Sequence, residues 1–375
     1  MTNKTTESKN SGALAKKKLN LLALASLTTL ACTQVFAADL IDAQDKSGGT
    51  THYQQINLVA DLAGVAQLQD TNLVNAWGVS AGATGPFWVG DNGTGNATLY
   101  AVTNDAAGAP HAARNARVVS IPNTGGVTGL FANTTPAFNG DAFVFVSEDG
   151  TISGWRGALG NAAEVLAARN GAVYKGVAQT TNAAGPVLLA ANFSEGTLDE
   201  YDATLTLINQ FVDRSAPAGY APFNVANVNG TIFVTFAKQD ATKHDDSAGR
   251  GHGLIDIFTL EDGTFLRFAA GKAAGGRIHE MDSPWGMALA PASFGTHADQ
   301  LLVGNFGSGT IMTFDADGRF HGLLKGSKGG ALSIDGLWSL RFGTTGTAGV
   351  TNDLYFSAGP KGESHGLFGV LQKQN

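Results

Sequence analysis

A short motif with a small central residue and mostly apolar flanks recurs six times along this chain, at intervals of about fifty residues. The copies are centred on Gly78, Gly129, Gly176, Asn224, Gly286 and Ser339, so the intervals are 51, 47, 48, 62 and 53 residues. A period of this length is typical of folds in which similar supersecondary units stack side by side. The repeat therefore constrains the fold more than any other feature of the sequence.

Each motif is followed by further short apolar segments with the length of β-strands. The predicted second strands are Pro86–Gly90, Ala142–Val146, Pro186–Ala191, Thr231–Phe236, Gln300–Val303 and Asp353–Phe356. The third strands are Ala97–Val102, Thr151–Trp155, Thr197–Tyr201, Leu254–Thr259, Thr310–Phe314 and Leu367–Leu371. The fourth are Arg117–Ile121, Glu164–Ala168, Leu207–Val212, Thr264–Ala269 and Phe320–Leu324. Six units of four strands predict an all-β fold, a six-bladed β-propeller.

The sixth unit starts near Asp335 and ends after its third strand. A leftover strand, Gln54–Asp61, precedes the first unit. We expect this N-terminal strand to become the outer strand of the last blade, which closes the ring and removes an open sheet edge. The predicted propeller covers residues 54–372, with a tail at 373–375.

The composition agrees with this fold. The chain holds 50 Gly, and only 15% of its residues are charged. Glycine opposes long helices, and the 43% of hydrophobic residues opposes disorder. In a propeller, small residues let the crowded inner strands approach one another, and turns such as Asp149-Gly150 and Asp262-Gly263 favour glycine.

Residues 1–37 have the pattern of a signal peptide. Lys16 to Lys18 are followed by the apolar run Leu19 to Ala31, and Val35 and Ala37 occupy the −3 and −1 positions of a cleavage site. We expect cleavage after Ala37, a flexible segment at residues 38–53, and a periplasmic or extracellular protein. The alternative is a lipoprotein attached through Cys32, whose preceding residues fit a lipobox poorly.

The net charge of the chain limits the kinds of partner that it is suited to bind. Residues 1–37 contain five Lys and one Glu, so their removal changes the net charge from −7 to −11. An acidic protein is poorly suited to nucleic acid, and no second apolar run is long enough to span a membrane. We expect a monomer whose partner is a small molecule or a protein.

Two sets of loops share one face of a propeller: those before the inner strands and those between the second and third strands. We expect a binding site there, at the mouth of the central channel. The candidate ligand-binding residues are Trp77, Asn92, Asn192, Asn224, Trp285, Asn305, Trp338 and His365. The alternative is structural, because such tryptophans also pack between blades and such asparagines also form turns.

The longest interval contains an insertion, Lys238–Gly253. Its candidate metal ligands are His244, Asp245, Asp246 and His252, since histidine and carboxylates suit a divalent cation such as Ca²⁺. The alternative is a solvated loop with internal hydrogen bonds. His252-Gly253-Leu254 is echoed by His365-Gly366-Leu367, so both histidines should face the same rim.

The segment Asn305–Asp315, Asn-Phe-Gly-Ser-Gly-Thr-Ile-Met-Thr-Phe-Asp, resembles NHL-type propeller repeats. The mature chain as a whole resembles a family of exported bacterial NHL-like propeller proteins. The matching segments include Asn75–Gly78, Phe87–Gly95, Lys243–Gly253, Ser283–Gly286, Asp335–Trp338 and Ala358–Gly369. The resemblance implies fold and export, and the family has no established activity.

Three functions remain open. The first is a propeller that binds a ligand or partner at its loop face. The second, by analogy with enzymes of the same fold, is a metal-assisted hydrolase, lactonase or lyase, with a cation at Asn75, Asn224, Asp282 and Asp335 or in the His244–His252 loop. The third is a surface or matrix protein. No nucleophile elbow, phosphate loop or catalytic cysteine is present, so the sequence assigns no catalytic residue.

Overall fold

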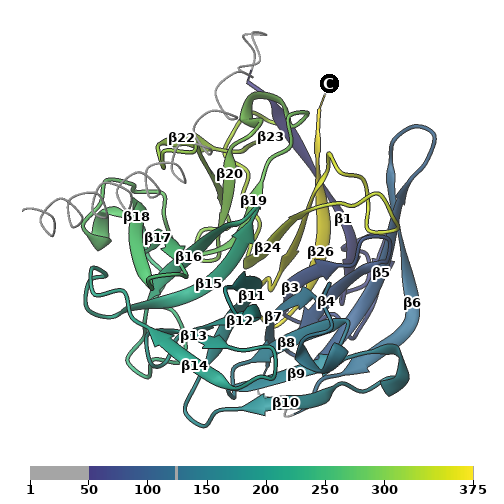
Figure 1. The fold of residues 1–375 in the computed structure, drawn as a ribbon. Helices are drawn as coiled ribbons and strands as arrows, with labels where there is room; N and C mark the ends of the chain where they lie inside the picture. Colours follow the sequence, from purple (N-terminus) through teal and green to yellow (C-terminus); the bar gives the residue numbers. More distant parts are fainter. Residues whose placement is uncertain (1–49, 123–125, 375) are drawn as a thin grey trace, which may run out of the picture. The chain divides into compact units, whose positions relative to one another are not determined.

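Six β-sheets form a closed ring in the computed structural model, which describes residues 50–122 and 126–374 (Figure 1). Each sheet is one blade, and in the five four-stranded sheets the strands follow one another in sequence order from the channel outward. All pairs within the four-stranded blades are antiparallel. This confirms the predicted six-bladed β-propeller.

Five blades are continuous in sequence, with four strands each. Blade 1 contains β3 (Ala76–Ala81), β4 (Phe87–Asp91), β5 (Asn96–Asn104) and β6 (Pro110–Ser120). Blade 2 contains β7 (Val127–Ala132), β8 (Phe143–Ser147), β9 (Thr151–Trp155) and β10 (Glu164–Ala168). Blade 3 contains β11 (Tyr174–Asn182), β12 (Gly185–Asn192), β13 (Thr197–Tyr201) and β14 (Leu207–Phe211). Blade 4 contains β15 (Tyr220–Val228), β16 (Thr231–Lys238), β17 (Leu254–Thr259) and β18 (Thr264–Ala270). Blade 5 contains β19 (Pro284–Leu289), β20 (Leu301–Asn305), β21 (Ile311–Phe314) and β22 (Phe320–Leu323).

The sixth blade joins the two ends of the propeller. Its inner strands are β24 (Leu337–Phe342), β25 (Leu354–Ala358) and β26 (Leu367–Lys373). The N-terminal strand β1 (His52–Ala60) pairs antiparallel with β26, which confirms the predicted closure. The short strands β2 (Leu68–Gln69) and β23 (Lys325–Gly326) pair in parallel with β1, and the sequence had not indicated them.

The inner strands of neighbouring blades contact one another all the way round the channel. Their small central residues make this possible. A Cβ atom added at Gly286 would lie 2.4 Å from the carbonyl oxygen of Trp338, and one at Gly129 would lie 2.8 Å from the amide nitrogen of Val177. Real Cβ atoms do not approach backbone so closely, so these glycines are required by packing between blades.

The apolar core is divided among the spaces between blades. Between blades 1 and 6, for example, the ring of Phe87 lies 4.6 Å from that of Tyr355 and 5.3 Å from that of Phe368. In the part of the chain that the structure describes, the helices are single 3₁₀ turns, none of which has the length to cross a membrane. The predicted signal peptide and Cys32 lie outside the described residues.

Substitution of Gly286 by alanine should destabilise the ring. The new methyl group would collide with the backbone of β24, and such overpacking costs roughly 1–3 kcal/mol. Urea unfolding measures the loss. The matched control is Gly157→Ala, because a Cβ atom there meets nothing within 4 Å and Gly157 has no positive φ. Equal stability of the two variants would contradict the packing requirement.

Candidate functional site at the loop face

Three tryptophans from three inner strands meet at the centre of the channel. The ring centroids of Trp77 and Trp338 are 3.8 Å apart, and Trp285 lies edge-on to Trp338 at 5.8 Å. Phe306 stacks on Trp338 at 3.9 Å. All three tryptophans are buried, and Phe193 and Phe223 complete the cluster. We call these six side chains the aromatic plug; they fill the channel as core.

Asn75 holds the plug from the loop side. Its Oδ1 accepts hydrogen bonds from the indole Nε1 atoms of Trp77, at 3.0 Å, and Trp338, at 3.1 Å. Its Nδ2 donates to Asn92 and to Glu363, at 3.1 and 3.2 Å. Asn75 takes a φ of 48°, a conformation that asparagine tolerates better than most residues. One side chain thus links the plug to the loops above it.

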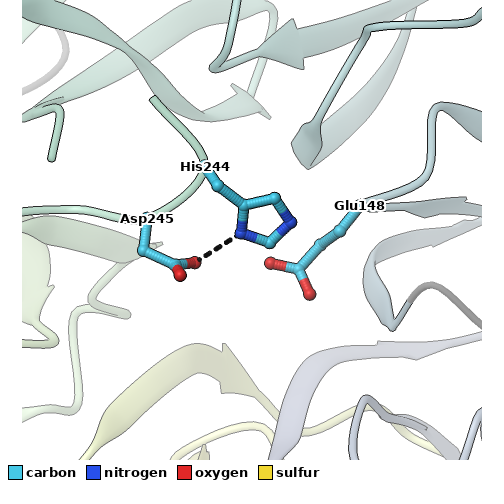
Figure 2. A group of neighbouring side chains, drawn as sticks. All are labelled: Glu148, His244 and Asp245. Carbon is cyan, nitrogen blue, oxygen red and sulfur yellow. Dashed lines mark hydrogen bonds and ion pairs between the residues drawn. The ribbon is translucent and has the colours of Figure 1, made fainter. Parts of the chain in front are cut away.

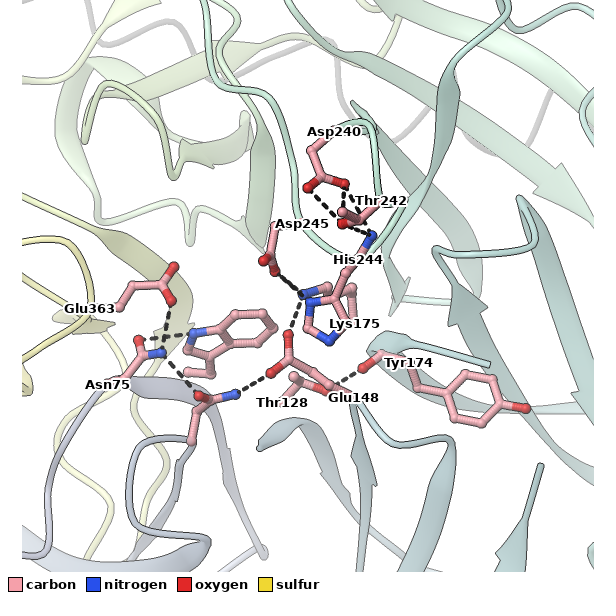
Figure 3. A network of polar contacts seen from close by, with 12 residues as sticks. Asn75, Thr128, Glu148, Tyr174, Lys175, Asp240, Thr242, His244, Asp245 and Glu363 are labelled. Carbon is pink, nitrogen blue, oxygen red and sulfur yellow. Dashed lines mark hydrogen bonds and ion pairs between the residues drawn. The ribbon is translucent and has the colours of Figure 1, made fainter. Parts of the chain in front are cut away.

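Lys175 places a buried positive charge beside the plug (Figure 3). Its ammonium lies 5.0 Å from the centroid of the Trp77 ring and donates to Glu148 and to Asp245, the latter at 3.0 Å. Burial by itself lowers the pKa of this ammonium, but the two carboxylates outweigh burial and the pKa is raised. Lys175 therefore stays charged at neutral pH.

Glu148, His244 and Asp245 come together from two distant loops (Figure 2). Glu148 lies between β8 and β9, whereas His244 and Asp245 lie in the insertion between β16 and β17. One ligand atom of each lies within 4.8 Å of the others, and His244 Nδ1 is 3.0 Å from Asp245 Oδ1. Histidine and carboxylates form a donor set suited to a divalent cation.

The structure divides the four predicted metal ligands. His244 and Asp245 join Glu148 in this cluster. Asp246 instead accepts a hydrogen bond from the hydroxyl of Ser283. His252 contacts the backbone oxygen of Ser247 at 2.8 Å and so fixes the insertion itself. The insertion therefore places the carboxyl groups of Asp245 and Asp246 at the loop face, beside Lys175 and Ser283.

Two carboxyl groups near Lys175 have raised pKa values. Burial raises the pKa of Glu363 to about 7 and that of Asp246 to about 6. Lys175 lowers both values, whereas the charge of Asp245 raises both. Both groups therefore exchange protons near neutral pH, which is common at functional sites.

The remaining predicted ligand residues lie around the plug or within their own blades. Asn92 donates to Glu148 at 3.0 Å and belongs to the network around Lys175. Asn224 donates to the backbone oxygen of Trp285 at 2.8 Å. Asn192 and Asn305 are buried and bond within their own blades: Asn192 donates to Asp199 of β13, and Asn305 accepts from the backbone amide of Asp282. His365 contacts Asp61 at 2.7 Å, beside the closing strand.

The candidate residues chosen from the sequence include none of Lys175, Glu148 and Glu363. Glu363 lies between β25 and β26 of blade 6, in the same position as Glu148 in blade 2. That shared position between second and third strands was the available signal. What the sequence lacked was the geometry of the insertion, which brings Asp245 within reach of Lys175.

Known proteins resemble this chain in sequence or in fold. No protein-family description matches the chain. The uncharacterized proteins R648 and L690 of Acanthamoeba polyphaga mimivirus are each 28% identical to it, over 84% and 81% of this chain and 79% and 81% of their own lengths. These viral relatives do not support the bacterial origin or the export that the resemblance implied.

Solved structures share the fold at low sequence identity. An auxiliary nutrient binding protein from Bacteroides thetaiotaomicron is 11% identical, with a TM-score of 0.51 over 81% of this chain and 70% of that one. Virginiamycin B lyase from Staphylococcus aureus is 10% identical, with a TM-score of 0.48 over 86% of this chain and 99% of that one. At these identities the likeness is one of fold.

Proposed function

We propose that this protein is a binding propeller whose loop-face mouth holds a small cation or a cation-bearing ligand. One observation carries the proposal: four carboxyl groups, those of Glu148, Asp245, Asp246 and Glu363, lie close enough to the buried ammonium of Lys175 to interact with its charge. Since Glu148 and Asp245 already share that ammonium, the other two carboxyls add unbalanced negative charge as they ionise. A cation at this mouth would offset that charge.

A divalent cation is the simplest occupant. The Glu148–His244–Asp245 cluster offers oxygen and nitrogen donors, and its two members on the insertion are exposed to solvent. Lys175 opposes such an ion, because two charges about 4 Å apart at an effective dielectric constant near 20 repel by roughly 4 kcal/mol per unit charge product. Further carboxylates are therefore needed, and Glu363 and Asp246 supply them when ionised.

Cation affinity should fall as the pH falls. Ionised carboxylates bind cations, so a cation must displace the protons of Glu363 and Asp246, whose pKa values are about 7 and about 6. Isothermal titration with Ca²⁺ and with Mn²⁺ should give a dissociation constant at least about tenfold higher at pH 5.5 than at pH 8.

Asp245→Asn tests the site of that binding. It removes a charge from the cluster at a side chain that is 65% exposed, so the fold should tolerate it. We expect a loss of affinity of about tenfold, whereas Glu261→Gln, at an exposed acid in blade 4, should bind as the wild type does. Unchanged binding in Asp245→Asn, or no binding of either ion at pH 8, would overturn the proposal.

A second candidate function is metal-assisted hydrolysis or lyase chemistry at the same mouth. The pKa of Glu363 favours it, because a carboxyl group with a pKa of about 7 can both accept and donate a proton at neutral pH. Turnover of a panel of esters and lactones should then be lost in Glu363→Gln and rise with an apparent pKa near 7. Absence of turnover, or equal turnover in the variant, excludes this candidate for the panel tested.

We also infer export, on the support of the signal-peptide pattern at residues 1–37. Expression of the full chain in a bacterial host should yield a periplasmic or secreted protein that begins at Ala38, as intact-mass analysis would show. A product that keeps Met1 and stays in the cytoplasm would contradict cleavage after Ala37. A lipid-bearing product that begins at Cys32 would contradict it as well.

A further inference from the structure

The far end of the channel, beyond the aromatic plug, contains a cavity of about 460 Å³. The inner strands of all six blades line it, each from its small central residue toward its C-terminal end. Trp285 belongs both to the plug and to the cavity wall, so the plug separates this cavity from the acidic loop face. The site proposed above therefore plays no part in it.

The cavity wall combines apolar residues with neutral polar residues, and it carries one charge. Leu130, Val177, Met287 and Leu340 belong to its lining, together with several glycines and alanines. Arg341, near the end of β24, is the one charged residue in this lining. No acidic residue of the described chain lies in the wall to balance it.

Arg341 also lacks an ionic partner elsewhere in residues 50–122 and 126–374. Its Nη2 donates to the backbone oxygen of Ala81 at 3.2 Å, and its Nε is buried with no acceptor among those residues. Other partly buried arginines of this protein are paired: Arg156 with Asp141 and Arg267 with Asp256. A desolvated charge without a counter-ion is costly, and arginine keeps its charge at all ordinary pH values.

We propose that this cavity binds a small organic carboxylate, whose anionic group pairs with Arg341 and whose apolar body lies against the inner strands. The planar guanidinium matches a carboxylate in shape and donor geometry. Burial lowers the pKa of Arg341, in keeping with a charge that no neighbouring carboxylate compensates. The wall offers one guanidinium together with apolar residues such as Leu130 and Leu340, which favours a monoanion with an apolar tail over inorganic phosphate.

The test uses hexanoate as the probe, with hexanol and inorganic phosphate as the other two arms. Binding is followed in the whole protein by NMR of ¹³C-methyl-labelled methionine, because Met287 lines the cavity whereas Met312, buried in blade 5, does not. Hexanoate should shift the Met287 signal and leave that of Met312 in place. Hexanol and phosphate should bind at least about tenfold more weakly, because hexanol lacks the carboxylate and phosphate lacks the apolar chain.

Arg341→Met should weaken hexanoate binding by at least about tenfold, because it removes the charge and keeps the apolar stem. Arg319→Met, at an exposed arginine on the outer side of blade 5, is the matched control and should bind as the wild type does. If Arg341→Met does not fold, Gly82→Phe replaces it. A Cβ atom at Gly82 meets nothing within 4 Å, so a large side chain there should fill part of the cavity and weaken binding.

Three results would overturn the proposal. The first is an unchanged Met287 signal at high hexanoate concentration. The second is equal hexanoate affinity in the wild type and in the folded Arg341→Met or Gly82→Phe variant. The third is tighter binding of phosphate or hexanol than of hexanoate, because the ligand would then not be an organic carboxylate.

Discussion

The buried ammonium of Lys175 holds together the loops that make up the candidate site. It lies on β11 of blade 3, yet it bonds Glu148 of blade 2 and Asp245 of the blade 4 insertion. The backbone oxygen of Lys175 accepts a hydrogen bond from the indole of Trp285 in blade 5, and its ammonium lies over the ring of Trp77 in blade 1. Five blades therefore meet at one residue. Removing the ammonium would leave the carboxylates of Glu148 and Asp245 facing each other without a counter-charge, and the Glu148 side chain is only 11% exposed.

The crowding of the inner strands explains why the channel has two unlike ends. Small central residues bring the strands close, and the tryptophans beside them fill the space that remains. The plug divides the channel. Acidic loops surround the loop-face end, whereas the cavity at the other end carries the guanidinium of Arg341. The two ends thus have opposite charge and should select opposite classes of ligand.

Periodic features were predictable from the sequence, and contacts between loops were not. The strand Glu164–Ala168 was predicted with its observed bounds, and the closing strand near Gln54 was identified because the last unit lacked an outer strand. These results follow from repetition and from the need to pair sheet edges. Asp245 and Lys175 are 70 residues apart, and no repeat relates them. Their contact depends on the particular path of the insertion, which local patterns do not encode.

The stability of Lys175→Met as a function of pH tests the central role of this ammonium most directly. Loss of one partner from a buried ion pair costs about 3 kcal/mol or more. The difference in the free energy of unfolding between the wild type and Lys175→Met should be greatest near pH 8. Glu363 and Asp246 have raised pKa values in the folded state, so the stability linked to their protons is present at low pH and is lost as the pH rises through about 6 to 7. Without Lys175 this loss of stability should grow.

Urea unfolding at pH 5.5 and pH 8, with the exposed Lys238→Met as control, should show a much lower free energy of unfolding for Lys175→Met than for the wild type at pH 8. The difference should be smaller at pH 5.5. A Lys175→Met protein as stable as the wild type at pH 8 would contradict the account.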